Sequence, residues 1–346
     1  MTNKKIVVLV VLLLIAFFIW KTDFSKFNLS DFIHKFSSAN GIKGKIVYIY
    51  EPLINGKLDI HRTEIYIMNS DGTGKRQLTY NNFYDTMPKL SPDGKRVVFV
   101  SARTPSGGVP LLGMIPSFSH QIYIINTDGT GERQLTFSEG NCLYPRWLSN
   151  EKIVFLSQDS EGEYRWMVMN VDNGNIQSLD EYLGFHIPGN PYFSPDGSKI
   201  AYTIESGTGS SRKSQIWIIN RDGTGKRQLT HGECDESPAW SPDGKKIAYS
   251  SRYIVNMGYV GPSPRFAIYV IDVDSGNIRQ LTDDGIRPCW SPDGQKIVFE
   301  KYWGNGILIM DADGKNKRWI APKSMRDLTR FRTGKIVDLY MWPDWR

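Results

Sequence analysis

Short strand-like runs recur along this chain, and each run is bounded by residues that favour turns. Gln121–Ile125 and Gln215–Ile219 are runs of isoleucine with an aromatic residue, and Lys95–Val100 is an apolar run that opens on a lysine. β-Branched and aromatic residues bounded by Gly, Pro, Asn and Asp are typical of β-strands. The pattern therefore predicts an all-β protein built from many short strands.

The runs belong to an internal repeat. The tetrapeptide Ser-Pro-Asp-Gly occurs four times, beginning at Ser91, Ser194, Ser241 and Ser291. The last three copies begin 47 and 50 residues apart (241 − 194 and 291 − 241), whereas Ser91 and Ser194 are separated by about two periods. A degenerate copy, Arg146–Glu151, lies between those two. Self-similarity at this period indicates a repeat architecture.

Each repeat contains four antiparallel strands, which we name a to d. Strand a precedes Ser-Pro-Asp-Gly, strand b follows it, and strand c alternates. Strand d carries Gln-Leu-Thr after an Asp-Gly-Thr-Gly turn. Proline presets φ and glycine accepts a positive φ, so both turn sequences suit tight hairpins. Four strands in each unit of about 50 residues describe a propeller blade. The repeats predict a six-bladed β-propeller of four-stranded antiparallel blades.

Closure of the ring is expected to use both ends of the propeller. Blade one opens at Gly44–Tyr48, which resembles strand b without a strand a before it. The C-terminal segment Leu339–Asp344 contains a Trp and a Pro-Asp in roughly the order of strand a. We predict that this segment supplies the missing strand and so removes the exposed sheet edges.

The repeat resembles that of the TolB family. The residues Pro238–Tyr249 read Pro-x-Trp-Ser-Pro-Asp-Gly-Lys-x-Ile-x-Tyr, and Gln-Leu-Thr closes the repeat. The resemblance covers residues 41 to about 320 and implies a protein-binding propeller outside the cytoplasm. Similar repeats occur in propellers of prolyl-oligopeptidase-type and tricorn-type peptidases and of oligogalacturonate lyases, and a fold alone does not assign a function. We expect the N-terminal α/β domain of TolB to be lacking, because only about 20 residues separate the apolar segment from blade one.

The N-terminus carries an apolar run, Ile6–Trp20, directly after Lys4 and Lys5. The run fits a buried helix, a cleaved signal peptide or an uncleaved signal anchor, and the anchor is favoured because no small-residue cleavage site lies close by. The run would span about 22 Å at 1.5 Å per residue, and Trp20 with snorkelling lysines can extend it towards the ~30 Å hydrocarbon core. We expect a single-pass protein of the cell membrane with the propeller on the extracytoplasmic side.

This reading gives three parts: a transmembrane segment at 1–21, a juxtamembrane stalk at 22–40 and the propeller at 41–346. Phenylalanines recur near helical spacing in the stalk, which favours an amphipathic helix, although a disordered tether fits the segment almost as well.

Candidate catalytic chemistry is sparse. No Gly-x-Ser-x-Gly motif occurs, none of the five histidines forms a ligand pair, and the three cysteines form no Cys-x-x-Cys unit. We therefore expect no catalytic residue, cofactor, metal site or disulfide framework, and expect the cysteines to be small strand residues. The net charge of +6 comes largely from a stretch between residues 315 and 335. A solvated face is one interpretation of this stretch, and contact with anionic lipid or cell-wall polymer is the other. We expect no nucleic-acid partner, and the oligomeric state stays open.

Loop lengths predict the binding face. The a–b and c–d turns are short in every repeat, whereas the b–c loops of blades two and five carry the apolar insertions Ala102–His120 and Arg252–Arg265. Long apolar loops usually bind a partner or pack down as lids. The residues that we expect to contact a partner from these insertions are Leu111, Leu112, Met114, Phe118, Tyr253, Met257 and Tyr259. The d–a linkers are expected to bring a second set to the channel mouth: Tyr84, Asp85, Tyr144, Phe185, His186, Asp235, Glu236 and Arg287.

The sequence thus favours a non-catalytic, membrane-anchored propeller that binds a protein or peptide of the cell envelope. The alternatives are a lyase or hydrolase of acidic glycans, with His186 and His231 as its metal ligands, and a plain structural spacer.

Overall fold

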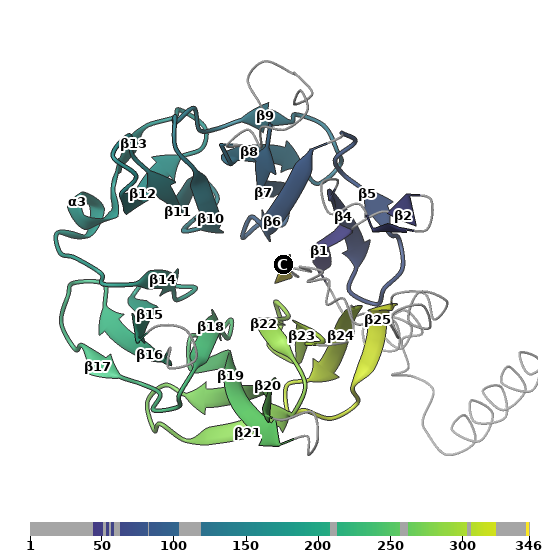
Figure 1. Ribbon diagram of the computed structural model, residues 1–346, viewed down its shortest axis with the longest axis vertical. Coiled ribbons are helices and arrows are strands. Elements are labelled where there is room, and N and C mark those ends of the chain that lie inside the picture. The colour runs from purple at the N-terminus through teal and green to yellow at the C-terminus, as the bar shows by residue number, and fades with distance from the viewer. Residues whose placement is uncertain are drawn as a thin grey trace, which may run out of the picture. The chain divides into compact units, whose positions relative to one another are not determined.

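Six four-stranded antiparallel sheets form a ring in the computed structural model (Figure 1). The structure describes residues 44–50, 53–54, 57–58, 63–81, 83–103, 119–207, 213–256, 262–302, 306–322 and 344–345. All of them belong to one unit that spans residues 43–346. In every sheet the strand order from the inside outwards is a, b, c, d, as the repeat predicts.

Blades one to three use the first half of the described chain. Blade one consists of β26 (Asp344–Trp345), β1 (Lys45–Tyr50), β4 (Glu64–Asn69) and β5 (Arg76–Gln77). Blade two consists of β6 (Tyr84–Leu90), β7 (Arg96–Ala102), β8 (Gln121–Asn126) and β9 (Arg133–Gln134). Blade three consists of β10 (Cys142–Trp147), β11 (Lys152–Gln158), β12 (Tyr164–Asn170) and β13 (Ile176–Ser178). A small hairpin, β2 (Leu53–Ile54) and β3 (Lys57–Leu58), lies between β1 and β4 in the chain.

Blades four to six complete the ring. Blade four consists of β14 (Asn190–Phe193), β15 (Lys199–Ser206), β16 (Lys213–Asn220) and β17 (Arg227–Gln228). Blade five consists of β18 (Asp235–Trp240), β19 (Lys246–Asn256), β20 (Pro262–Asp272) and β21 (Ile278–Thr282). Blade six consists of β22 (Ile286–Trp290), β23 (Lys296–Glu300), β24 (Gly306–Asp311) and β25 (Arg318–Pro322).

The ring closes as the sequence predicts. β26 pairs antiparallel with β1, with Ile46 opposite Trp345 and Val47 opposite Asp344. The C-terminal strand is therefore strand a of blade one, and closure by the C-terminal segment is confirmed. The paired residues are Asp344, the last residue of the predicted segment Leu339–Asp344, and Trp345 beyond it.

The Ser-Pro-Asp-Gly turns share one local structure. In the first copy the Ser91 hydroxyl donates to the Asp93 carboxylate at 2.5 Å, and the Gly94 main chain adopts a φ of 68° that suits only glycine without strain. The hydroxyls of Ser194, Ser241 and Ser291 make the same bond at 2.6 Å. These turns and the c–d turns lie on one face of the ring, the turn face, because strands a and c run towards it. The b–c loops and d–a linkers lie on the other, the loop face.

Blades pack against each other through apolar side chains of strands b and c. One cluster joins Val47 and Ile67 of blade one to Leu90 and Phe99 of blade two. Similar clusters join blades two and three, four and five, and five and six. The core of the propeller therefore lies in the seams, by which we mean the boundaries between neighbouring blades.

Two segments differ from the prediction. The blade-five insertion, expected as a loop from Arg252 to Arg265, is mostly a long hairpin in which β19 and β20 stay paired as far as Asn256 and Pro262. Its β-branched and aromatic residues favour extended backbone, so both strands continue into the segment that was expected to be a loop. The linker after β13 forms a short helix, α3 (Leu179–Leu183), because Ser178 and Glu181 make a capping box.

The predicted transmembrane segment 1–21 and stalk 22–40 lie outside the described residues. Within the described ranges, no helix has the length and hydrophobicity needed to cross a bilayer. Cys142, Cys234 and Cys289, all of them described, form no disulfide bond with one another, and the first two are buried.

Candidate functional site

A cavity of about 260 Å³ occupies the centre of the ring. Strand a of every blade contributes to its wall, and the cavity extends to the prolines of three Ser-Pro-Asp-Gly turns on the turn face. The residues that give it chemical character are Met87, Lys89, Tyr144, Arg146, Trp147, Tyr192, Ser237, Trp240, Arg287, Cys289, Trp290 and Asp344. The central cavity, which we call the channel, therefore brings aromatic, cationic and anionic groups together.

Repeated β-bulges place four of these side chains in the wall. Met87, Tyr144, Ser237 and Arg287 each precede a proline of strand a, and each has a φ of 52–54°. The a–b pairing shifts register at the same four places. A non-glycine residue at positive φ is strained by about 1–3 kcal/mol, and such strain concentrates where a structure holds ligands. The bulges thus have the same backbone conformation in four blades but carry a different side chain in each.

Two of the three cations in the cavity have carboxylate partners. The Lys89 amine lies 3.6 Å from the Asp344 carboxylate, which also accepts a bond from the Leu90 amide at 2.8 Å. The Arg287 guanidinium lies 2.7 Å from the Glu300 carboxylate. These pairs neutralise one side of the channel.

Arg146 differs from the other two cations. Its Nη1 donates to the Pro191 carbonyl at 3.1 Å, and its guanidinium lies 4.0 Å from the centre of the Tyr192 ring and 5.1 Å from that of Trp166. No carboxylate lies within ion-pair distance of Arg146 in the described part of the chain. A guanidinium stacked on aromatic rings keeps its in-plane donors available for a planar acceptor such as a carboxylate.

The structure brings only part of the predicted channel set together. Tyr144 and Arg287 line the cavity. Tyr84 is half-buried and packs edge-on against His120, and Glu236 is half-buried in β18 beside Ser250. These two residues do not line the cavity.

Phe185 and His186 lie away from the channel, which corrects the expectation that they approach its mouth. His186 is exposed and bonds through Nδ1 to the Asp180 carboxylate of α3 at 2.8 Å, and α3 lies on the outer rim of the ring (Figure 1). Phe185 packs against Trp217 and Phe193. The linker is drawn outwards because α3 inserts its apolar side chains between blades three and four.

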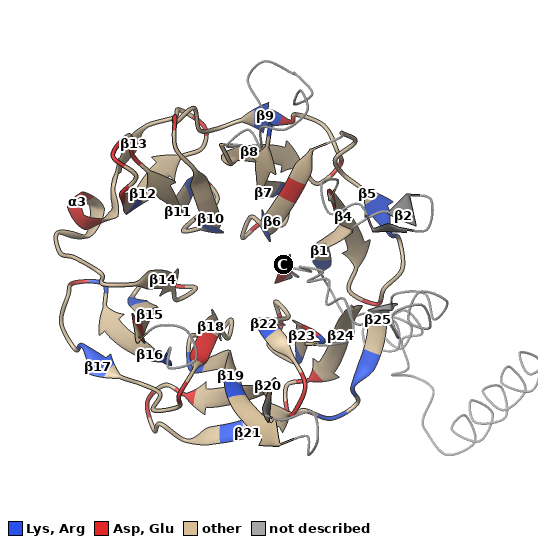
Figure 2. Cartoon of the chain, viewed as in Figure 1, with Lys and Arg blue, Asp and Glu red and all other residues tan. Residues whose placement is uncertain are grey.

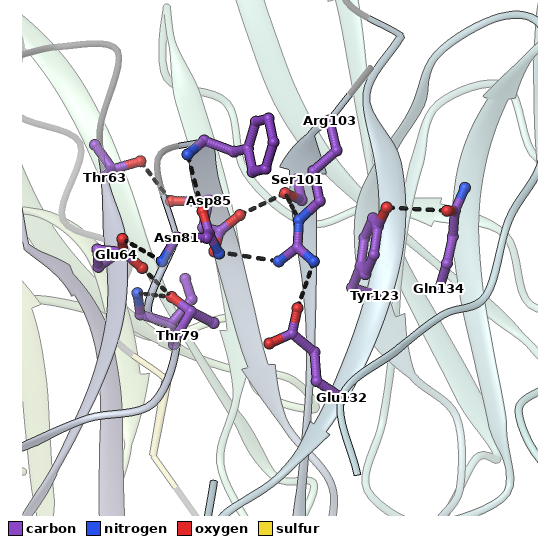
Figure 3. A network of polar contacts seen from close by, with 12 residues as sticks. Thr63, Glu64, Thr79, Asn81, Asp85, Ser101, Arg103, Tyr123, Glu132 and Gln134 are labelled. Carbon is purple, nitrogen blue, oxygen red and sulfur yellow. Dashed lines mark hydrogen bonds and ion pairs between the residues drawn. The ribbon is translucent and has the colours of Figure 1, made fainter. Parts of the chain in front are cut away.

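Asp85 and Asp235 are buried, and their carboxylates accept hydrogen bonds from the d–a linkers that precede them. Asp235 accepts from the Gly232 amide at 2.9 Å. Asp85 is fully buried, and it accepts bonds from Ser101 and Asn81 and lies 3.7 Å from the Arg103 guanidinium (Figure 3). Burial raises the pKa of Asp85 to about 6, despite these hydrogen bonds.

Glu64 belongs to the same network (Figure 3). It accepts from the Thr79 hydroxyl at 2.6 Å and from the Asn81 amide at 2.9 Å, while Asn81 also bonds Asp85. Burial raises the pKa of Glu64 to about 7. The network fastens blade one to blade two.

The predicted partner-contacting loops fall mostly outside the described residues. Leu111, Leu112, Met114, Phe118, Met257 and Tyr259 lie there. Tyr253 is described, is 37% exposed, and donates through its hydroxyl to the Asp283 carbonyl at 2.8 Å.

Sequence reasoning missed most of the cavity wall, including Arg146, Tyr192 and Lys89. A usable signal was present, because the residues before and after the repeated proline of strand a vary between blades while the proline stays fixed. Histidine carries no comparable signal: within the described ranges, no cluster of three or more His, Cys, Asp or Glu side chains is arranged to hold a metal ion.

Comparison with known proteins agrees with this geometry. The family model of the TolB β-propeller domain matches residues 57–186 and 111–261, which together make up more than half of the chain. An uncharacterised protein of Agrobacterium fabrum is 30% identical over 148 residues, which are 40% of this chain and 46% of that protein. The Tol-Pal system protein TolB of Francisella tularensis is 26% identical over 193 residues, 55% of this chain and 39% of that protein. The chain thus spans less than half the length of the curated relatives it matches.

A solved structure shows the same fold. The crystal structure of TolB from Acinetobacter baumannii is 19% identical and superposes with a TM-score of 0.63, over 92% of this chain and 70% of that one. The repeat, the six closed blades and the family match lead to one conclusion: the chain belongs to the TolB β-propeller domain family.

Proposed function

We propose that this protein is a non-catalytic propeller of the cell envelope that binds an extended segment of a partner protein in its central channel. The observation that carries the proposal is the cavity of about 260 Å³ walled by strained bulges and aromatic side chains. A cavity of this volume takes a few side chains of a peptide rather than a folded domain. Similarity to TolB proteins supports a location in the envelope.

We further propose that the bound segment carries a carboxylate, either an acidic side chain or a chain terminus. Arg146 supports this choice, because Lys89 and Arg287 already face Asp344 and Glu300. A charge-assisted hydrogen bond to a guanidinium contributes about 1.5–3 kcal/mol. Tyr144 and Tyr192 would hold the apolar parts of the same segment.

The remaining parts of the proposal concern location and a second contact surface. The N-terminal segment 1–21 would anchor the protein and 22–40 would connect it to the propeller on the extracytoplasmic side. The insertions of blades two and five would contact the partner on the loop face. Exposed aromatic residues on that face support this surface: Tyr80 is 76% exposed and Phe137 is 80% exposed, each directly after a Gln-Leu-Thr.

Site-specific photo-crosslinking of the full chain in cells tests the channel. A photoreactive phenylalanine analogue would replace Tyr144 in the cavity or, as the matched control in the same blade, Tyr164, which is 46% exposed in β12. We expect position 144 to form an adduct with an envelope protein and position 164 to form none. Adducts of equal yield at the two positions, or none at 144, would refute channel binding.

A further inference from the structure

Five of the six outermost strands carry an arginine, which Figure 2 shows as blue on β5, β9, β17, β21 and β25. Four of these outer arginines donate to main-chain carbonyls at the c–d turn of the next blade: Arg76 to Thr127 and Asp128, Arg133 to Val171, Arg227 to Val273, and Arg279 to Ala312. β13 has Gln177 at this position, opposite Val168, as Arg227 lies opposite Ile218 and Arg279 opposite Val270. The seam between blades three and four therefore lacks the outer arginine.

A second bond links blades on the channel side. Three tryptophans at the end of strand a donate through Nε1 to a carbonyl of the preceding blade: Trp147 to Lys89 at 2.9 Å, Trp240 to Tyr192 at 2.8 Å, and Trp290 to Ala239 at 3.1 Å. Blade four has Phe193 at this position, and a phenyl ring has no N–H to donate. The same seam thus lacks the inner tryptophan.

A third bond joins main chains near the loop face. A residue in strand c or directly before it bonds a residue near the start of strand a of the next blade at four seams: Asp85 to Thr63 at 3.0 Å, Cys142 to His120 at 2.7 Å, Ser214 to Glu233 at 3.1 Å, and Gly285 to Phe266 at 3.0 Å. Blades three and four make no such bond within residues 119–207 and 213–256. Within the described residues, all three kinds of inter-blade bond are therefore missing between blades three and four.

Side chains of α3 and one arginine hold this seam instead. Leu183 and Phe193 pack with both the blade-three and the blade-four side of the seam, and Tyr182 stacks 4.3 Å from the Arg221 guanidinium. On the channel side, Arg146 of blade three reaches the Pro191 carbonyl and the Tyr192 ring of blade four. Apolar contacts keep the blades together, but they tolerate sliding and separation better than directional hydrogen bonds.

Two buried polar atoms add to the weakness of this seam. The Tyr202 hydroxyl lies in a fully buried side chain that packs with Leu183 and Phe185, and it has no hydrogen-bond partner among the described residues. The Arg221 Nη1 is also buried, and no described residue accepts a hydrogen bond from it. A buried polar atom left unpaired costs about 1–3 kcal/mol, and that cost is relieved when water enters. Opening of this seam is thus less costly than opening of a fully bonded one.

We propose that the seam between blades three and four is the joint at which the propeller ring opens. Arg146 donates the hydrogen bond that holds the two blades together on the channel side of this joint. Local opening is easiest where hydrogen bonds between elements are fewest. Because Arg146 also lines the channel, a carboxylate bound there would act directly on the joint. That last link depends on the proposed function, whereas the joint itself is a property of the free protein.

Hydrogen exchange followed by mass spectrometry on the unliganded full chain tests the joint. We expect amides of β14 and of its preceding linker to exchange about tenfold faster than those of the equivalent inner strand β18, a ratio that corresponds to 1.4 kcal/mol. Equal or slower exchange at β14 would overturn the proposal. This measurement needs no ligand, so a failure of the proposed function would not affect it.

Variants with opposite expected effects sharpen the test. Phe193→Trp restores an indole N–H and should slow exchange at β14, and the matched change Trp240→Phe should speed exchange at β18. Gln177→Arg supplies the outer arginine and serves as a second variant if Phe193→Trp does not fold. Arg146→Gln should speed exchange at β14 about threefold or more. Unchanged exchange at β14 in both Arg146→Gln and the folded restoring variant would refute the assignment.

Discussion

Glu64 occupies in blade one the position that Gln121 occupies in blade two. Thr79 donates to the Glu64 carboxylate at 2.6 Å, as Thr136 donates to the Gln121 carbonyl oxygen at 2.8 Å. Gln121 also donates to the Ser138 and Gly140 carbonyls, which an ionised carboxylate cannot do. A glutamine therefore fits this site without burying a charge.

The raised pKa of Glu64 predicts a pH-dependent stability. The pKa is about 7 in the folded protein and near 4.5 in the unfolded chain, so the folded state binds the proton more tightly. Stability from this group is present below about pH 4.5 and is lost as pH rises towards 7. We expect Glu64→Gln to be more stable than the native protein by about 1–2 kcal/mol at pH 8, with no difference at pH 4, by urea denaturation. Gln121→Glu should show the reverse, and a pH-independent difference for Glu64→Gln would contradict the prediction.

Arg146 provides a second prediction at this scale, for partner binding. Arg146→Gln should weaken capture of the partner adduct at position 144 by about tenfold or more, because a charge-assisted hydrogen bond is lost. The control is Arg165→Gln, whose guanidinium is 69% exposed and pairs with Asp159 at the surface. The measurement is adduct yield at equal protein level. Equal loss in both variants would show that charge in general, and not the channel site, controls binding.

At the scale of the element, the inner tryptophans are expected to stabilise the seams. Trp147→Phe keeps the ring in the apolar cluster of blades two and three but leaves the Lys89 carbonyl without its indole donor. We expect a loss of about 1–2 kcal/mol in urea denaturation. Trp319→Phe on the outer strand β25, where the side chain is 41% exposed, should change stability by less than about 0.5 kcal/mol. Equal effects of the two changes would refute the role of the indole bond.

Strands and turns of this fold could be predicted from sequence because their determinants are local. The repeated Ser-Pro-Asp-Gly fixes the a–b turn through its own serine, aspartate and glycine, and the degenerate Arg146–Glu151 still forms the β10–β11 turn. The long hairpin of blade five was mistaken for a loop, because its strands continue without a new turn signal.

The site was predicted less well because its determinants are not local. Tyr144, which the linker lengths place at the channel mouth, lines the cavity, whereas its neighbour Arg146 could not be predicted, since the bulge that orients strand a follows from pairing with strand b. The position of His186 depends on α3, and α3 is held by packing against side chains of blades three and four that its own capping signal does not reveal. The local sequence pattern therefore predicts the strands and turns of each blade. The residues of the channel wall depend on strand pairing and on packing between blades, which the local pattern does not reveal.

At the scale of the whole molecule, one carboxylate connects three blades at the point of closure. Asp344 of β26 belongs to blade one, accepts from the Leu90 amide of blade two, and lies 3.7 Å from the Cys289 thiol of blade six. Its side chain is buried, so these bonds form away from water. The two-residue strand β26 thus connects blade one to both of its neighbours, blades two and six.

Removal of residues 344–346 should therefore destabilise the entire ring. The Leu90 amide would be left buried without a partner, and β1 would lose its inner neighbour, for a combined loss of about 2–4 kcal/mol in urea denaturation. Asp344→Asn keeps an acceptor for Leu90 but removes the charge opposite Lys89, so it should cost less than about 1 kcal/mol, because Lys89 is partly exposed. A truncated chain as stable as the native one would mean that the ring is held by its other seams alone. A loss in Asp344→Asn as large as in the truncation would instead assign the closure to charge rather than to strand pairing.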